Sequence, residues 1–151
     1  MKKTNFLYLL GLIFTLSFSA CSDDDENIGS PNDLIGTWQS GTGSGWIKEN
    51  GKIIEEWTDE AIDELRVTFY EDGTFASYEY YNGKWEGELE GTWTYKNGKI
   101  YTYDFEGNLD DCMTVKSISS SSFVIEVYEK GTEGSITYEY YECGTYHKIS
   151  D

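Results

Sequence analysis

Residue types that could carry out nucleophilic or metal chemistry are scarce in this chain. The only histidine, His147, lies close to the C-terminus, so a Ser-His-Asp or Cys-His arrangement would depend on it alone. Cys112, Cys143 and this histidine match no structural zinc spacing. A surface histidine at the end of a strand is the simpler interpretation. The sequence therefore predicts no catalytic residue, no metal site, no cofactor, and a protein that is not an enzyme.

Acidic residues are abundant instead, with 28 Asp and Glu in the chain. Asp110 and Asp111, beside Glu106 and Asn108, could offer oxygen ligands to calcium, but their spacing lacks the Asp-x-Asp-x-Asp-Gly loop and its distal Glu. A solvated loop is the interpretation that we favour. A carboxylate pair that hydrolyses glycosidic bonds stays open as an alternative, and it would require two carboxylates that converge in a cleft.

The N-terminus carries a different kind of signal. Lys2 and Lys3 precede an apolar run over residues 6–18, which is too short to span a bilayer and suits the hydrophobic region of a secretion signal. Residues 16–21 read Leu-Ser-Phe-Ser-Ala-Cys and resemble a lipobox, although Phe18 stands where these signals usually have an aliphatic residue. The resemblance implies cleavage after Ala20 and lipidation of Cys21. A secreted protein without a lipid is the alternative.

Residues 22–26 read Ser-Asp-Asp-Asp-Glu, directly after the predicted lipid site. This run resembles the export tag that sends lipoproteins to the outer face of the outer membrane in one group of Gram-negative bacteria; a solvated spacer is the alternative. Cleavage removes two lysines and no acid, so the net charge changes from −17 to −19. Such a charge disfavours nucleic acid and anionic lipid as partners. We expect an outer-membrane lipoprotein that is held by its lipid and reaches the cell surface if the tag is read.

Composition divides the mature chain into two parts. Residues 21–33 hold the only proline, Pro31, among Ser, Asp, Asn and Gly, as expected of a flexible tether. Residues 34–151 form one domain that is long enough to bury a core. The chain is therefore expected to consist of a signal peptide at 1–20, a lipidated tether at 21–33 and a folded domain at 34–151.

Turn dipeptides such as Asp72-Gly73, Asn82-Gly83 and Asn97-Gly98 recur at short intervals in the folded domain and indicate hairpins. The segments between the turns are predicted strands at 34–40, 52–57, 65–71, 74–81, 89–96, 99–105, 113–118, 123–129 and 136–142. Only residues 58–65 have a helical pattern, with Thr58 as a possible N-cap. The glycine-rich segment 41–45 is expected to be a flexible loop at one end of the fold.

Alternation of apolar and polar residues gives these strands one apolar face each. The apolar positions include Trp93 and Tyr95, Tyr101 and Tyr103, Phe123, Ile125 and Val127, and Tyr138 and Tyr140. An antiparallel meander of eight or nine strands leaves two exposed edges unless it closes on itself. The sequence therefore predicts an all-β, up-and-down antiparallel barrel, with a two-sheet sandwich as the alternative.

Cys112 and Cys143 are the cysteines left for a disulfide in an oxidising compartment. In a simple meander they would lie roughly seven residues apart along their strands, or about 23 Å at 3.3 Å per residue. A disulfide requires Cα atoms within about 7 Å. The geometry favours two free thiols, and the compartment favours a bridge.

Three motifs carry a resemblance to a known family. Leu34-Ile35-Gly36-Thr37-Trp38, the segment from Phe69 to Phe75 and Gly91-Thr92-Trp93 resemble the lipocalin-like lipoproteins of Gram-negative bacteria. The resemblance implies an eight-stranded lipocalin-like β-barrel whose floor is built by Gly36 and Trp38. Lipocalins often hold an arginine near the last strand that packs on this tryptophan. Here the candidates are Lys148 and His147.

The family implies a small, mostly apolar ligand in the mouth of the barrel. The candidate residues for lining a ligand cavity, or for filling the core in its place, are Phe69, Phe75, Trp93, Tyr95, Tyr101, Tyr103, Tyr138 and Tyr140. We predict a protein that binds a small apolar or amphipathic ligand at the cell envelope. The alternative is a surface interaction or structural subunit with a filled barrel, which Trp46, Trp57 and Trp85 exposed in one patch would favour.

Overall fold

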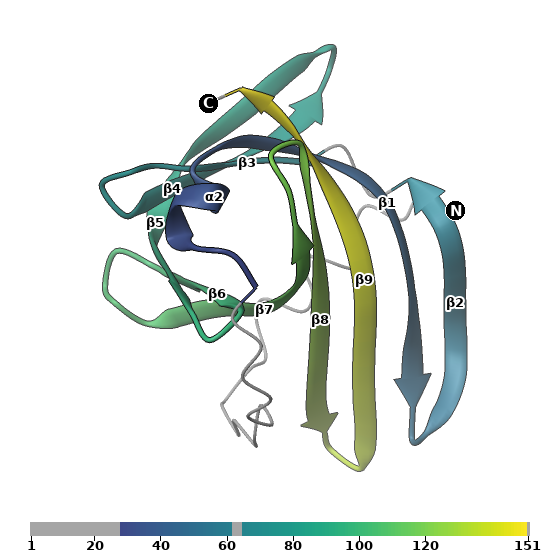
Figure 1. Cartoon of the computed structure of the whole chain (residues 1–151). Coiled ribbons are helices and arrows are strands. Elements are labelled where there is room, and N and C mark those ends of the chain that lie inside the picture. Colours follow the sequence, from purple (N-terminus) through teal and green to yellow (C-terminus); the bar gives the residue numbers. More distant parts are fainter. Residues whose placement is uncertain (1–27, 62–64, 151) are drawn as a thin grey trace.

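The computed structural model describes residues 28–61 and 65–150. The strands among these residues are β1 (Gly36–Glu49), β2 (Lys52–Ala61), β3 (Leu65–Phe69), β4 (Thr74–Tyr81), β5 (Lys84–Lys96), β6 (Lys99–Tyr103), β7 (Leu109–Ile118), β8 (Ser122–Glu133) and β9 (Ile136–Ser150). All of them belong to one antiparallel sheet (Figure 1). None of the helices in the described ranges is long and apolar enough to cross a membrane. The predicted all-β fold is confirmed.

The sheet closes because β1 pairs with β9 along most of its length, from Thr37↔Ser150 to Glu49↔Tyr138. On its other side, β1 pairs first with β3 and then with β2. Strands β1 and β3 to β9 therefore form a closed eight-stranded barrel, and β2 continues the line of β3 beyond it. Figure 1 shows β8, β9, β1 and β2 extending side by side past the shorter strands. A two-sheet sandwich is excluded.

The predicted helix over residues 58–65 is wrong wherever the structure describes it. Thr58 to Ala61 end β2, Leu65 begins β3, and residues 62–64 lie outside the described residues. The backbone of β2 is held by β1 through pairs such as Gly43↔Glu60 and Thr42↔Ala61. A segment of two turns gains little from its own helix propensity, because nucleation is unfavourable. The ladder to β1 therefore decides the conformation.

The glycine-rich segment that was expected to be a loop lies inside β1. Gly45 is needed there because a Cβ atom would lie 2.3 Å from the Tyr141 carbonyl oxygen and 2.4 Å from Cζ2 of Trp57. A glycine in a strand often marks such a close approach. At Gly45, the ring of Trp57 therefore lies directly against the backbone of β1.

A short helix, α2 (Pro31–Leu34), precedes the barrel and lies against β5. Ser30 is its N-cap residue, and the Asp33 carboxylate in the first turn accepts hydrogen bonds from the Ser30 backbone N–H and hydroxyl, at 2.7 and 2.9 Å. Ile28 packs against the core, and its carbonyl accepts a hydrogen bond from the Tyr95 hydroxyl. Residues 28–33, which were assigned to the tether, are therefore ordered against the barrel, while residues 21–27 lie outside the described residues.

The core fills the part of the barrel next to α2. Its buried members are Leu34, Trp38, Phe69, Phe75, Trp93, Ile100, Val115, Phe123, Ile125 and Tyr146. They come from α2 and from all eight barrel strands, so closing the barrel and burying the core are one event. We call this end of the interior the floor.

Candidate functional site

The floor is centred on Trp38, whose side chain is fully buried. Its Nε1–H donates to the Leu34 carbonyl at 2.7 Å, and its ring meets Phe123 edge-on at 4.7 Å. Lys148, its partner on β9, places Nζ 5.3 Å from the ring centroid. Lys148 therefore takes the position where the resemblance led us to expect an arginine, while Gly36 begins β1 with a positive φ of 124°.

Three of the predicted cavity residues fill the floor rather than line an open space. Phe69, Phe75 and Trp93 are all nearly inaccessible, and the rings of Phe69 and Trp93 lie 4.9 Å apart. The Trp93 Nε1–H donates to the Tyr70 carbonyl at 3.1 Å. Tyr95 is half-buried, and its hydroxyl is used by Ile28. These residues belong to the core, which was the second role considered for them.

The assignment of Tyr101 and Tyr103 to the interior is wrong. Ile100 and Thr102 are the buried residues of β6, at 0% and 4% exposure, and Thr102 pairs with the core residue Trp93. Since strand side chains alternate, Tyr101 and Tyr103 point outward. Alternation alone does not say which face is inward, and tyrosine covers an outer wall as readily as it fills a core.

We call the other end of the barrel interior the mouth. It is lined by Ile47, Trp57, Tyr140, Glu142 and Glu129. Tyr140 pairs with the buried Ile47, and its ring lies 6.0 Å from the ring of Trp57. Trp57 reaches this position by crossing over Gly45. Tyr138 precedes Tyr140 by two residues on β9, so it lies on the same face of the strand, and it is half-buried. Of the predicted cavity residues, only these two tyrosines lie here.

Carboxylates also face the interior near the mouth. Glu129 follows Phe123, Ile125 and Val127 on the inner face of β8, and Glu142 lies between Tyr140 and Tyr146 on that of β9. Glu142 accepts a hydrogen bond from the Tyr140 hydroxyl. On β7, Asp111 shares the inner face of Met113 and Val115. The mouth is therefore both aromatic and acidic.

Burial changes the ionisation of these groups. Desolvation raises the pKa of Asp111, and the charge of Asp110 adds to it. Desolvation also raises the pKa of Glu129, assisted by the charge of Asp111. The pKa of Tyr146 is raised by burial and by Glu142 and Asp111, so its hydroxyl stays protonated. Removing negative charge from this region, or adding a cation, would lower its electrostatic free energy.

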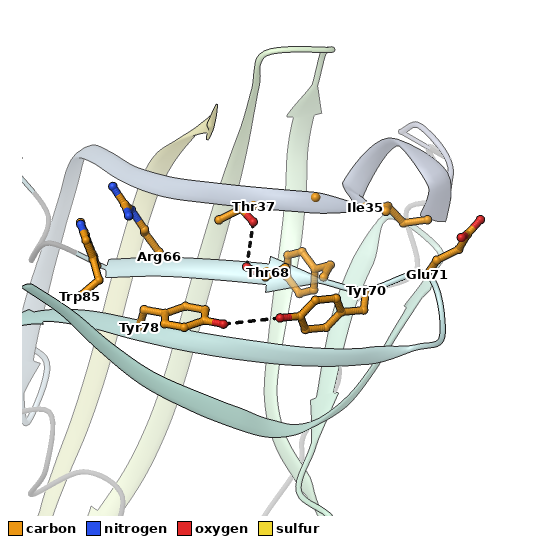
Figure 2. Close-up of a pocket in the computed structure, with 10 residues that line it drawn as sticks. Ile35, Thr37, Arg66, Thr68, Tyr70, Glu71, Tyr78 and Trp85 are labelled. Atoms are coloured by element: carbon orange, nitrogen blue, oxygen red, sulfur yellow. Dashed lines mark hydrogen bonds between the residues drawn. The ribbon is translucent and has the colours of Figure 1, made fainter. Parts of the chain in front are cut away.

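A separate groove lies on the outer wall of the barrel, over the start of β1, along β3, and beside Tyr78 of β4 and Trp85 at the start of β5 (Figure 2). Its volume is about 430 Å³, and it is lined by Ile35, Gly36, Thr37, Arg66, Thr68, Phe69, Tyr70, Glu71, Tyr78 and Trp85. Figure 2 shows Arg66 beside Trp85 at one end and Glu71 at the other, with the hydroxyls of Tyr70 and Tyr78 pointing toward one another between them. No residue pattern in the sequence had indicated this groove.

The three tryptophans that would mark a protein-binding patch are not together. Trp46 stacks on Tyr141 at 5.6 Å on the outer face of β1 and β9. Trp57 lies at the mouth, and Trp85 packs under Arg66 on the outer wall. The condition that would have favoured an interaction subunit is therefore not met.

Cys112 and Cys143 are not joined to each other by a disulfide. The offset between them is smaller than expected: Cys143 pairs with Glu126, and Glu126 with Thr114, so Cys112 is only two residues out of register. Strand β8 lies between them, which separates their backbones by about 10 Å across the sheet, more than the ~7 Å that a bridge allows. The geometric argument against a bridge therefore holds for these two cysteines, although their separation runs mainly across the strands and not along them.

The loop around Asp110 provides no converging calcium ligands. Asp104 accepts hydrogen bonds from the backbone of Glu106 and Asn108 and from the Asn108 amide, so the loop itself uses this carboxylate. Within 28–61 and 65–150, no group of three or more His, Cys, Asp or Glu side chains is arranged to hold a metal ion.

Taken together, the geometry defines a class: an up-and-down antiparallel β-barrel of eight strands, closed by a packed floor and lined at its mouth. The family model of the lipocalin-like domain matches residues 34–125, and the chain belongs to this family. The family fold is one of binding and transport, and its members typically bind small hydrophobic ligands.

Other comparisons add little. No curated protein matches the chain. The crystal structure of bovine odorant-binding protein in complex with its natural ligand is similar at 16% sequence identity and a TM-score of 0.36, covering 83% of this chain and 77% of that chain.

Proposed function

We propose that this protein captures a small amphipathic molecule at the mouth of its barrel, as a lipoprotein anchored in the outer membrane. The observation that carries the proposal is the contrast between the two ends of the interior. The floor is filled by ten buried side chains. The mouth, by comparison, presents the rings of Trp57 and Tyr140 together with Glu129 and Glu142, and these residues remain partly accessible.

The lining selects the kind of ligand. Aromatic rings favour an apolar or aromatic body. Asp111 and Glu129 are ionisable groups that burial already disfavours as anions, so an anionic head group would add like charge to them. A cationic or neutral head group would relieve this repulsion, and a cation also gains from the faces of Trp57 and Tyr140. The ligand is therefore an amphiphile whose polar end is an amine rather than a carboxylate.

The experiment uses the full chain with Cys21→Ala, which removes the thiol that we propose is lipidated. Isothermal titration compares dodecylamine with dodecanoate, both below their critical micelle concentrations. We expect the amine to bind at least tenfold more tightly, which corresponds to about 1.4 kcal/mol. Glu142→Gln keeps an acceptor for Tyr140 but removes the charge, and it should weaken amine binding.

The matched control is Glu126→Gln, which removes the same charge from the outer face of β8. It should leave the preference unchanged. Equal binding of the amine and the acid, or equal effects of the two variants, would refute a charge-selective mouth. Binding of neither ligand would favour the alternative, a filled barrel whose surface serves another protein.

The anchor rests on the lipobox and its flanking residues. Seven residues, 21–27, connect Cys21 to the first described residue, and fully extended they span at most about 25 Å. The barrel would then stay close to the membrane and sample ligands that leave it. Growth with an alkyne-tagged fatty acid, followed by click labelling, should mark the wild-type protein but not Cys21→Ala; equal labelling of both would contradict the anchor. Protease digestion of intact cells separates the cell surface from the periplasm.

A further inference from the structure

We propose that the groove on the outer wall is a second binding site, for a carboxylated sugar. It lies outside the barrel, so it is independent of the mouth and of the proposed function. The volume of about 430 Å³ is in the range of small-molecule sites, ~300–1,000 Å³. What distinguishes the groove is the set of groups that face it.

Arg66 is the only arginine of the chain, and its neighbours hold it in place. Its Nε and Nη2 both donate to Gln39 Oε1, at 3.1 and 3.0 Å, and its guanidinium carbon lies 3.8 Å from the centroid of the Trp85 ring. These contacts orient the planar group, and no described residue accepts a hydrogen bond from Nη1 or from the second Nη2 hydrogen. The side chain is preorganised for a bidentate bond to a carboxylate.

Among residues 28–61 and 65–150, no acid forms an ion pair with Arg66. Its partners there are the neutral amide of Gln39 and the ring of Trp85, in a chain with 28 acidic residues. The guanidinium carries one positive charge, and the edge that does not contact Gln39 has room for one carboxylate. Glu71, at the opposite end of the groove, would repel a second anionic group, so a phosphate-rich ligand such as a nucleotide is disfavoured.

The space between Arg66 and Glu71 is lined with hydroxyls and rings. Thr37 and Thr68 share a hydrogen bond of 3.0 Å, and Tyr70 and Tyr78 share one of 3.5 Å (Figure 2). Each pair uses one hydrogen between its members, so each keeps one O–H and several lone pairs for a ligand. Alternating hydroxyl donors and acceptors beside aromatic faces suit the hydroxyls and the apolar ring face of a sugar.

Gly87 of β5 leaves space for the side chain of Tyr78, which lines the groove. A Cβ atom on Gly87 would lie 2.7 Å from Cδ1 of Tyr78, so the tyrosine ring lies across β5 where the side chain is missing. Tyr78 is thereby held along the groove instead of standing away from it. The groove is a shaped surface rather than a chance gap between flexible side chains.

The test is a titration of the full chain carrying Cys21→Ala with glucuronate and glucose, followed by amide NMR shifts and saturation transfer. Glucuronate should bind at least tenfold more tightly than glucose, with shifts at Thr37, Thr68 and Tyr78. Arg66→Gln should abolish this preference, and Arg66→Lys should reduce it, because it keeps the charge but loses the fork.

Lys84→Gln is the control, since it removes one positive charge from the tip of the β4–β5 hairpin, next to Trp85. It should leave the preference intact, as should Glu142→Gln at the mouth. The proposal is overturned if glucuronate and glucose bind equally, if neither binds, if Arg66→Gln has no more effect than Lys84→Gln, or if the shifts lie at the mouth. Unchanged thermal midpoints of the Arg66 variants establish that a loss of binding is not a loss of folding.

Discussion

Replacing Trp38 with phenylalanine tests whether the floor is packed as described. The change removes the Nε1–H that the Leu34 carbonyl accepts at 2.7 Å, and Leu34 is itself fully buried. An acceptor left unpaired in such a place costs about 1–3 kcal/mol. The smaller ring adds a cavity cost of about 1–2 kcal/mol, a fraction of the ~3–5 kcal/mol for removing a whole buried aromatic side chain.

The expected loss is therefore about 2–5 kcal/mol, a large part of the ~5–15 kcal/mol that stabilises a typical domain. Equilibrium urea unfolding, followed by far-UV circular dichroism and analysed by linear extrapolation, measures it directly. Trp85→Phe is the matched control, because Trp85 lies on the outer wall and contacts Arg66 through its ring face. It should cost no more than about 1 kcal/mol. Equal losses in the two variants would refute the packed floor.

Three further predictions concern the mouth and the thiols. Burial raises the pKa of Asp111 above its unfolded value, so the ionised carboxylate destabilises the fold, and stability falls as pH rises through the interval between the two pKa values. Asp111→Asn should therefore raise the thermal midpoint at pH 7 but not at a pH below the unfolded pKa. Equal midpoints of the wild type and the variant at pH 7 would contradict this prediction. Gly45→Ala places a Cβ 2.3 Å from the Tyr141 carbonyl oxygen and 2.4 Å from Trp57, so urea unfolding should show a loss of about 1–3 kcal/mol; unchanged stability would contradict the close approach. Unfolded, unreduced protein with Cys21→Ala should titrate two thiols, Cys112 and Cys143; a count of zero would establish a bridge.

The strands and turns could be predicted because local rules decide them. Asn82 and Asn97 adopt positive φ values of 49° and 53° in two-residue hairpin turns, as Asn-Gly sequences favour. All nine predicted strands are present, with ends that shift by several residues. Closure could be argued from the edges that an open meander would expose. The helix over residues 58–65 could not be excluded, since only the ladder to β1 overrides its local pattern.

The site was predicted in part. The resemblance predicted a cationic side chain near the last strand that packs on the tryptophan of the first strand. The structure places Lys148 of β9 against Trp38 of β1. Trp57 was missed because its position depends on Gly45 of the neighbouring strand. Glu129 and Glu142 were missed although a signal existed: each continues an alternating inner face by one more period, past Val127 and Tyr140 respectively.

The outer groove could not have been found from the sequence. It depends on the register that brings Arg66 beside Gln39 of β1 and lets Trp85 of β5 reach the guanidinium. Its residues come from distant strands and share no local spacing. Such a site follows only once the pairing of the strands is fixed.

Native mass spectrometry of the protein purified from its own cells under non-denaturing conditions tests the central claim, ligand capture at the mouth, most directly. We expect a reproducible small-molecule adduct on the wild-type chain that is lost in Trp57→Ala and kept in Arg66→Gln. Fragmentation of the adduct should identify an amphiphile with an amine. Bare protein, before and after exposure to envelope extracts, or an adduct that Trp57→Ala retains, would contradict the account.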